Sequence, residues 1–293
     1  MGLELWLVTV RWLHLLAVSL LFGAAVFPYY GMGKDTGEAY PPRGLPGLLI
    51  ASALLALISG VFWFVFAEAQ NETIAPVAWI RYRAISLARL ALTAILIAVL
   101  ARTRRPTPGF TLVAGSAVLL LSLALLGHDG TRTTAAATVR VLADSIHLLA
   151  SGVWVGALFM LTLLLLRQRR EVPAINDALM RFSGIGPVVV VALGLSGLAN
   201  GGLIGPQNAL QSFTNLYSQV LAVKIALFLL MLILAAGNRY WLTPKLQTAM
   251  NSETASQDPL RALKASLLVE TFLAVLVLAA VGWLGVLPPP GTK

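Results

Sequence analysis

The sequence predicts an all-α, polytopic membrane protein whose eight transmembrane helices form two parallel four-helix repeats. Hydrophobic residues make up 58% of the chain and charged residues 11%, against about 25% charged residues in soluble domains. Apolar runs of eighteen or more residues recur, and each can cross a hydrocarbon core of roughly 30 Å. A histidine-containing motif also occurs twice, which indicates an internal repeat.

The eight expected spans follow from these apolar runs and are separated by short polar connections. They cover residues of about 5–28, 47–67, 83–102, 110–127, 139–166, 184–204, 217–237 and 264–287. The first four make an N-terminal repeat over residues 1–128, and the last four make a C-terminal repeat over residues 129–293. Together the repeats form one membrane domain.

The duplication is clearest in the first and fifth spans. The tetrapeptide His-Leu-Leu-Ala begins at His14 and again at His147, and each copy is followed by Gly-Ala at Gly23 and Gly156. Four spans per repeat is an even number, so both repeats have the same orientation. They are expected to be related by a pseudo-twofold axis along the membrane normal.

Two further matches extend the repeat into neighbouring spans. Ser59 and the following glycine match Ser196 and its glycine, and Arg89 corresponds to Lys224. The N-terminal and C-terminal repeats therefore share their first three spans most clearly.

The basic residues predict the topology. Connections after the odd-numbered spans carry Lys34, Arg43, Arg102, Arg104, Arg105, Arg167, Arg169, Arg170, Arg181, Arg239, Lys245, Arg261 and Lys264. The opposite side carries Arg81, Arg83, Arg132, Arg140 and Lys293. The positive-inside rule places both termini outside, on the periplasmic side. This distribution also explains the net charge of +9 without a nucleic-acid partner.

Polar side chains gather in the outer half of the predicted bundle. They are Arg11, His14, Arg89, Asp144, His147 and Lys224, with Asn200 near the outer end of its span and His128 at the start of an outer loop. Charged groups at such depth are costly and indicate function.

Structural roles remain alternatives for each of these groups. Arg11 and Asp144 occupy equivalent positions and have opposite charges, so they are expected to neutralise each other across the pseudo-twofold axis. His14 and His147 have the alternative of hydrogen bonds that fix helix packing, and His128 that of a solvated loop residue. Near the cytoplasmic end of the eighth span, we expect Glu270 to pair with a nearby basic residue.

At these residues the chain resembles the copper resistance protein D (CopD) family of bacterial membrane proteins. The resemblance is densest over residues 120–290. It rests on Leu-Gly-His128, Asp144-x-x-His147, Trp154-x-Gly156, Arg181-Phe182-Ser183, Ser196-Gly197-x-x-Asn200, Lys224, Asn238-Arg239, Glu270 and Leu287-Pro288-Pro289, in the family's order. Ala157 replaces the second of two glycines that usually follow the tryptophan.

The resemblance implies an inner-membrane protein of copper uptake that acts with a small periplasmic copper-binding partner. It makes His14, His128 and His147 the candidate metal ligands, with Asp144 as their carboxylate partner.

The residue types favour an imidazole site over a sulfur site. Imidazole suits Cu(II), whereas Cu(I) prefers thiolate and thioether ligands. The chain has no cysteine and six methionines. The leading hypothesis is copper transport, without enzymatic activity, from an outer site between the two four-helix units.

Two alternatives remain. In the first, the protein is a haem-dependent membrane oxidoreductase with His14 and His147, or His147 and Lys224, at the haem, and with Arg11 and Arg89 on its propionates. The His-x6-Trp-x-Gly pattern also resembles a short membrane protoporphyrinogen oxidase family, which would pair His147 with Lys224. In the second, the protein is a sensor or assembly partner that docks a periplasmic protein.

Overall fold

The computed structural model describes residues 2–32, 44–69, 76–103, 108–126, 135–167, 172–204, 215–251 and 258–288. Throughout these residues the regular elements are helical. The long helices are α1 (Gly2–Gly31), α2 (Leu45–Ala69), α3 (Pro76–Arg102), α5 (Ala135–Arg167), α6 (Val172–Ile204), α7 (Leu216–Gly237) and α9 (Asp258–Leu284). Two shorter helices are α4 (Phe110–Leu121) and α8 (Thr243–Asn251).

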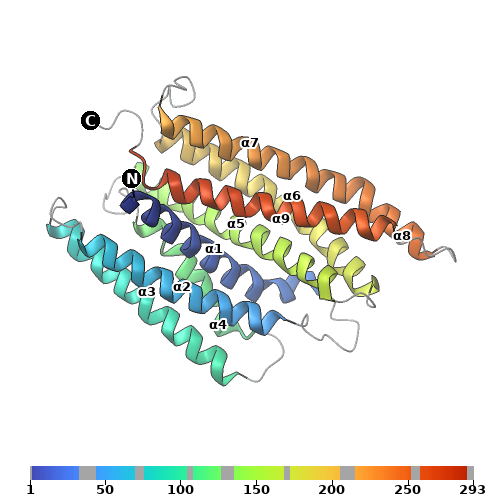
Figure 1. Cartoon of the computed structure of the whole chain (residues 1–293), viewed down its shortest axis with the longest axis horizontal. Coiled ribbons are helices and arrows are strands. Elements are labelled where there is room, and N and C mark those ends of the chain that lie inside the picture. The colour runs from blue at the N-terminus through green and yellow to red at the C-terminus, as the bar shows by residue number, and fades with distance from the viewer. Residues whose placement is uncertain are drawn as a thin grey trace.

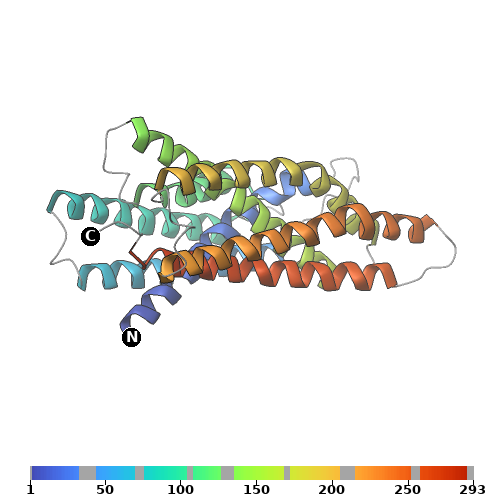
Figure 2. The same ribbon diagram turned by 90° about the horizontal axis from the view of Figure 1, so that it is seen from above.

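The helices lie side by side, and the chain runs back and forth along the bundle (Figures 1 and 2). α1 and α5 lie in the middle, α2 and α3 cover one flank, and α6 and α7 lie on the other (Figure 1). The start of α1 meets the end of α9, where the indole nitrogen of Trp12 donates to the carbonyl of Val275 at 3.2 Å. The chain therefore leaves the bundle at the end at which it entered.

Seven of the eight expected spans are confirmed as helices long and apolar enough to cross a membrane, counted over the described residues. The fourth is a shorter apolar segment, Phe110–Leu126, in which α4 is followed by the 3-10 turn Ala124–Leu126. The protein is therefore a membrane protein with multiple apolar helices.

One expected boundary was wrong. Helix α6 begins at Val172, twelve residues before the predicted span, because Ile175, Ala178 and Leu179 recur at helical spacing and are buried. Helix α7 ends at Gly237, as the predicted span does, but the helical chain does not stop there. It continues through a π-helical turn, Asn238–Leu242, into α8.

The centre of the bundle is a close contact between α1 and α5. A Cβ added to Gly23 would collide with the backbone of Gly152 and Gly156, and one added to Gly156 would collide with the backbone of Gly23. Small residues allow such close approach of membrane helices. Gly152 and Gly156 therefore form a packing surface of α5 against α1.

Outer helices carry apolar side chains on their outward faces. Exposed examples on α3, α6 and α7 are Ile80, Leu87, Ile95, Val188, Val191, Leu195, Leu198, Val223, Leu229 and Ile233. In a lipid environment these side chains meet acyl chains of similar polarity. The exposed apolar surface therefore fits a membrane and requires no protein partner.

Glu270 has a different partner from the expected basic residue. It is only 2% exposed, and its Oε2 accepts from the side-chain amide of Asn238 at 2.9 Å. The neighbouring Arg239 instead donates to the backbone carbonyl of Ser183. Asn238 opens the π-helical turn, and such turns are frequent at functional positions.

Replacing Gly156 with alanine should destabilise the protein, since the new methyl group meets the backbone of α1. Overpacking of this kind costs about 1–3 kcal/mol. We expect a melting temperature several degrees below wild type for the detergent-purified protein. Gly194→Ala on α6 is the matched control, because a Cβ there meets no atom within 4 Å and alanine favours helix. Equal melting temperatures for the two variants would contradict a close contact between α1 and α5 at Gly156.

Candidate functional site

His14 lies on the inner face of α1 and is 3% exposed. Its Nδ1 is 3.0 Å from the hydroxyl oxygen of Ser59 on α2. That hydroxyl donates its single proton to the carbonyl of Leu55 at 2.5 Å, so it can only accept from His14. The network therefore places the imidazole proton on Nδ1 and leaves the lone pair on Nε2.

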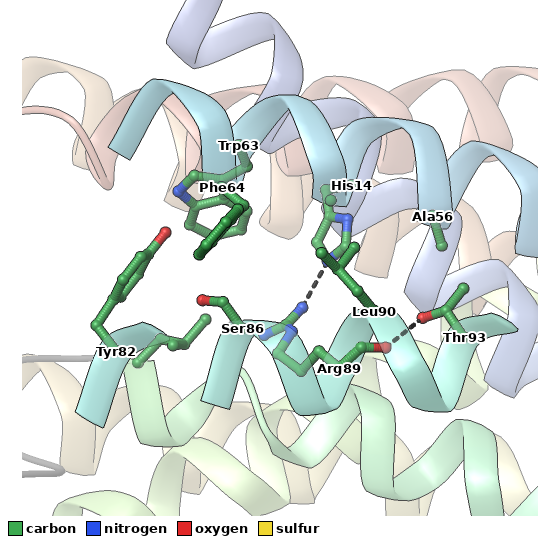
Figure 3. Close-up of a pocket in the computed structure, with 11 residues that line it drawn as sticks. His14, Ala56, Trp63, Phe64, Tyr82, Ser86, Arg89, Leu90 and Thr93 are labelled. Atoms are coloured by element: carbon green, nitrogen blue, oxygen red, sulfur yellow. Dashed lines mark hydrogen bonds between the residues drawn. The ribbon is translucent and has the colours of Figure 1, made fainter. Parts of the chain in front are cut away.

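The lone pair on Nε2 of His14 accepts a hydrogen bond from Arg89 on α3. Its Nη2 donates to Nε2 of His14 at 2.5 Å (Figure 3). Arg89 is itself buried, with 6% of its surface exposed. Both ring nitrogens of His14 are therefore hydrogen-bonded, Nδ1 to Ser59 and Nε2 to Arg89.

Arg11 lies one turn before His14 and contacts an aromatic ring. Its guanidinium carbon is 4.6 Å from the centroid of the Trp63 ring, a cation–π contact. The same ring lies edge-on to His14, at a centroid distance of 5.5 Å. The surroundings of His14 therefore carry two cations, Arg11 and Arg89.

His147 on α5 repeats the first part of this arrangement. Its Nδ1 is 3.0 Å from the hydroxyl oxygen of Ser196 on α6, which donates to the carbonyl of Ala192 at 2.5 Å. The same argument places the proton of His147 on Nδ1 and the lone pair on Nε2.

The groups around His147 differ in charge from those around His14. Asp144 lies one turn before His147, and its Oδ1 accepts from the side-chain amide of Asn200 at 2.6 Å. Lys224 is close enough for its charge to act on both His147 and Asp144. A carboxylate and an ammonium group thus accompany this imidazole, where the other has two guanidinium groups.

The two histidines form two centres and not a single one. Nine residues separate His14 from Gly23 and His147 from Gly156, which is about two and a half helical turns. Each imidazole therefore faces away from the glycine contact and into its own group of helices. Among the described residues, no three His, Cys, Asp or Glu side chains gather as a metal-binding group. His128 lies outside the described residues.

The described contacts of Arg11 and Asp144 differ from the expected neutralisation: Arg11 lies over the ring of Trp63, and Asp144 accepts a hydrogen bond from Asn200. By the repeat, Asn200 is the equivalent of Trp63. The same pair of positions thus makes a cation–π contact in one half and a hydrogen bond in the other.

A haem held by both His14 and His147 does not fit this arrangement. The cavity beside His14 is about 20 Å³, whereas sites for organic ligands of moderate size occupy about 300–1,000 Å³. Nε2 of His14, the atom that would bind iron, is taken by Arg89. His14 and His147 also face different groups of helices, so they cannot hold one macrocycle between them.

Several partners of the histidines were missed as functional residues in the sequence. Ser59 and Ser196 were visible as repeat matches, but their role depends on contacts across helices. Tyr82 and Ser86, which line the cavity beside His14, share a helical face with Arg89 through their spacing of seven and three residues. That spacing was the available signal.

Comparisons with known proteins cover nearly the whole chain. Residues 2–138 match the family model "Copper resistance protein D-like, N-terminal domain", and residues 176–284 match "Copper resistance protein D". The predicted division at residue 128 lies outside the described residues. No solved structure matches.

Three characterised relatives resemble the chain. Copper resistance protein D of Pseudomonas syringae pv. tomato is 30% identical over 309 residues, which cover 96% of each chain. Inner membrane protein YebZ of Escherichia coli (strain K12) is 26% identical over 82% of this chain and 85% of its own length. Copper transport protein CutJ of Bacillus subtilis (strain 168) is 36% identical over 121 residues, which are 40% of this chain and 22% of that protein. The chain belongs to the copper resistance protein D family.

Proposed function

We propose that this protein carries copper ions inward across the bacterial inner membrane and that copper binds beside His147. The proposal rests on one observation: an imidazole with an available Nε2 lone pair lies one helical turn after a carboxylate on α5, in the C-terminal half. The names of two relatives, copper resistance protein D and copper transport protein CutJ, support copper as the cargo.

The orientation of His147 suits a metal ligand. Metal-binding histidines usually donate their other ring proton to a fixed acceptor, which sets the tautomer. Ser196 is that acceptor, and it is held in turn by the carbonyl of Ala192. Nε2 is then the atom that faces the metal.

Two residues with oxygen donors lie about one helical turn from the imidazole and from its serine partner. Asp144 is one turn before His147 on the same face of α5, and Oδ1 of Asn200 is buried without a hydrogen-bond partner in the described part of the chain. Nitrogen and oxygen donors together suit Cu(II). Water or a periplasmic partner would complete the coordination, and a partly filled shell allows release, as conduction requires.

The N-terminal half is unsuited to a cation by the same reasoning. His14 uses its lone pair for Arg89, and Arg11 adds a second positive charge nearby. We therefore assign copper to His147 and Asp144, with His14 in a different role. His128 stays a candidate ligand from the sequence.

The remaining parts of the proposal concern topology and partners. Both termini face the periplasm, as the distribution of basic residues favours, and the two halves are parallel four-helix repeats. The repeated serine–imidazole contacts support this relation. A small periplasmic protein delivers copper to the outer end, and the chain acts as a transporter and not as an enzyme.

Replacing His147, or the serine that orients its ring, should impair copper accumulation and copper binding. We expect His147→Gln to lose copper accumulation in cells expressing the protein, because glutamine cannot replace the imidazole nitrogen. Ser196→Ala should weaken copper affinity by about 10–100-fold, the usual effect of losing a group that orients a ligand. Copper content by mass spectrometry and equilibrium binding to the purified protein measure both effects.

Ser59→Ala is the matched control for Ser196→Ala, since it makes the same change at the equivalent position of the other half. It should leave copper affinity near wild type. Normal accumulation in His147→Gln would refute the site. Unchanged cellular copper on removal of the whole protein would refute transport and favour a sensor or docking role.

The charges beside His147 should act in opposite directions. Asp144→Asn keeps the shape but removes the negative charge, so copper affinity should fall. Lys224→Met removes a positive charge from the same surroundings, so equilibrium affinity should rise. Affinity should also decrease on acidification in wild type, because metal binding requires a neutral imidazole. Equal affinities for the two variants would exclude a metal ion at this position.

A further inference from the structure

The N-terminal half contains a small cavity between α2 and α3, beside His14 (Figure 3). Its volume is about 20 Å³, enough for a single water-sized occupant. The polar groups at its wall come from His14, Tyr82, Ser86 and Arg89. Figure 3 shows the hydroxyl groups of Tyr82 and Ser86 turned toward the space between the two helices, on the same side as the guanidinium group.

Arg89 brings an uncompensated positive charge to this cavity. A guanidinium group stays protonated in proteins. Its Nη2 donates to the neutral His14, whereas its Nη1 is buried and has no hydrogen-bond partner among the described residues. A buried cation without a counter-charge costs several kcal/mol.

The protein groups near the cavity do not supply that counter-charge. None of the described lining residues is acidic. The acid on the adjoining turn of α2, Glu68, pairs with Arg83 at 2.8 Å. Arg11 on the other side of Trp63 increases the positive charge. The cavity is therefore a partly open, positively charged space lined by guanidinium and hydroxyl groups.

We propose that this cavity binds one small monovalent anion of the chloride class. The orphaned Nη1 of Arg89 donates to it, and so does the hydroxyl proton that the hydrogen-bonded pair Tyr82 and Ser86 leaves free. The volume excludes carboxylic acids of metabolite size and organic phosphates, and the charge excludes metal cations. The inference is independent of copper and of the site beside His147.

The equivalent positions of the C-terminal half support this division. Tyr217 corresponds to Tyr82, but Leu221 and Phe228 stand where the first half has Ser86 and Thr93. The C-terminal half thus lacks those hydroxyl groups and has Asp144 in place of Arg11. The N-terminal half thus retains side chains suited to an anion, and the C-terminal half retains side chains suited to a cation.

Equilibrium binding of radioactive chloride to the full-length, detergent-purified protein tests the proposal. The background buffer contains sodium gluconate, because gluconate is too large for the cavity. Wild type should bind one chloride per chain, saturably, with or without copper. Arg89→Met should abolish binding, and Tyr82→Phe should weaken it by at least about tenfold, since it removes a hydrogen bond to a charged group.

Arg81→Met is the matched control, because Arg81 lies on α3 two turns before Arg89 and is exposed. It should bind chloride as wild type does. Ser86→Ala adds a second mild variant in case Arg89→Met does not fold. Absence of saturable chloride binding in wild type would overturn the proposal and leave water as the occupant. Wild-type affinity in both Tyr82→Phe and Ser86→Ala would overturn it as well.

Discussion

The structure depends on the contact between α1 and α5 at Gly23 and Gly156. The backbones approach so closely there that neither position has room for a Cβ. Because each glycine follows its histidine by nine residues, about two and a half turns, the contact directs His14 and His147 away from each other. A repeat that suggests one shared site therefore produces two separate ones, and each is completed by the helices of its own half.

The two histidine centres share the same serine hydrogen bond, but they differ in the charged groups around the imidazole. In both, a serine whose own proton is held by a backbone carbonyl accepts from Nδ1 of the histidine. These hydrogen bonds pair polar groups that would be energetically costly if they were left unpaired in the membrane interior. Beyond it, the halves diverge. Arg89 takes up the lone pair of His14, whereas His147 has the ammonium group of Lys224 nearby and Asp144 one helical turn before it.

Much of the fold was predictable because membrane helices have a strong sequence signal. Length and hydropathy located seven long helices, and the repeat identified the histidines and their serines as equivalent. Helix ends were less predictable. The start of α6 at Val172 depends on amphipathic packing and not on hydropathy, and α7 continues into α8 because a π-helical turn places Asn238 against Glu270. Hydropathy contains no information on such contacts.

The sequence by itself determined that the chain is an α-helical membrane protein, that a histidine motif occurs twice, and that the chain resembles the copper resistance protein D family. The first conclusion follows from composition, and the other two from motifs that can be read in the chain alone. Only the tertiary structure decided which side chains meet. Arg11 contacts Trp63 and Asp144 contacts Asn200, although opposite charges at equivalent positions suggested that Arg11 and Asp144 pair. The physical reason is that such contacts depend on how neighbouring helices pack: α2 brings Trp63 to Arg11, and α6 brings Asn200 to Asp144.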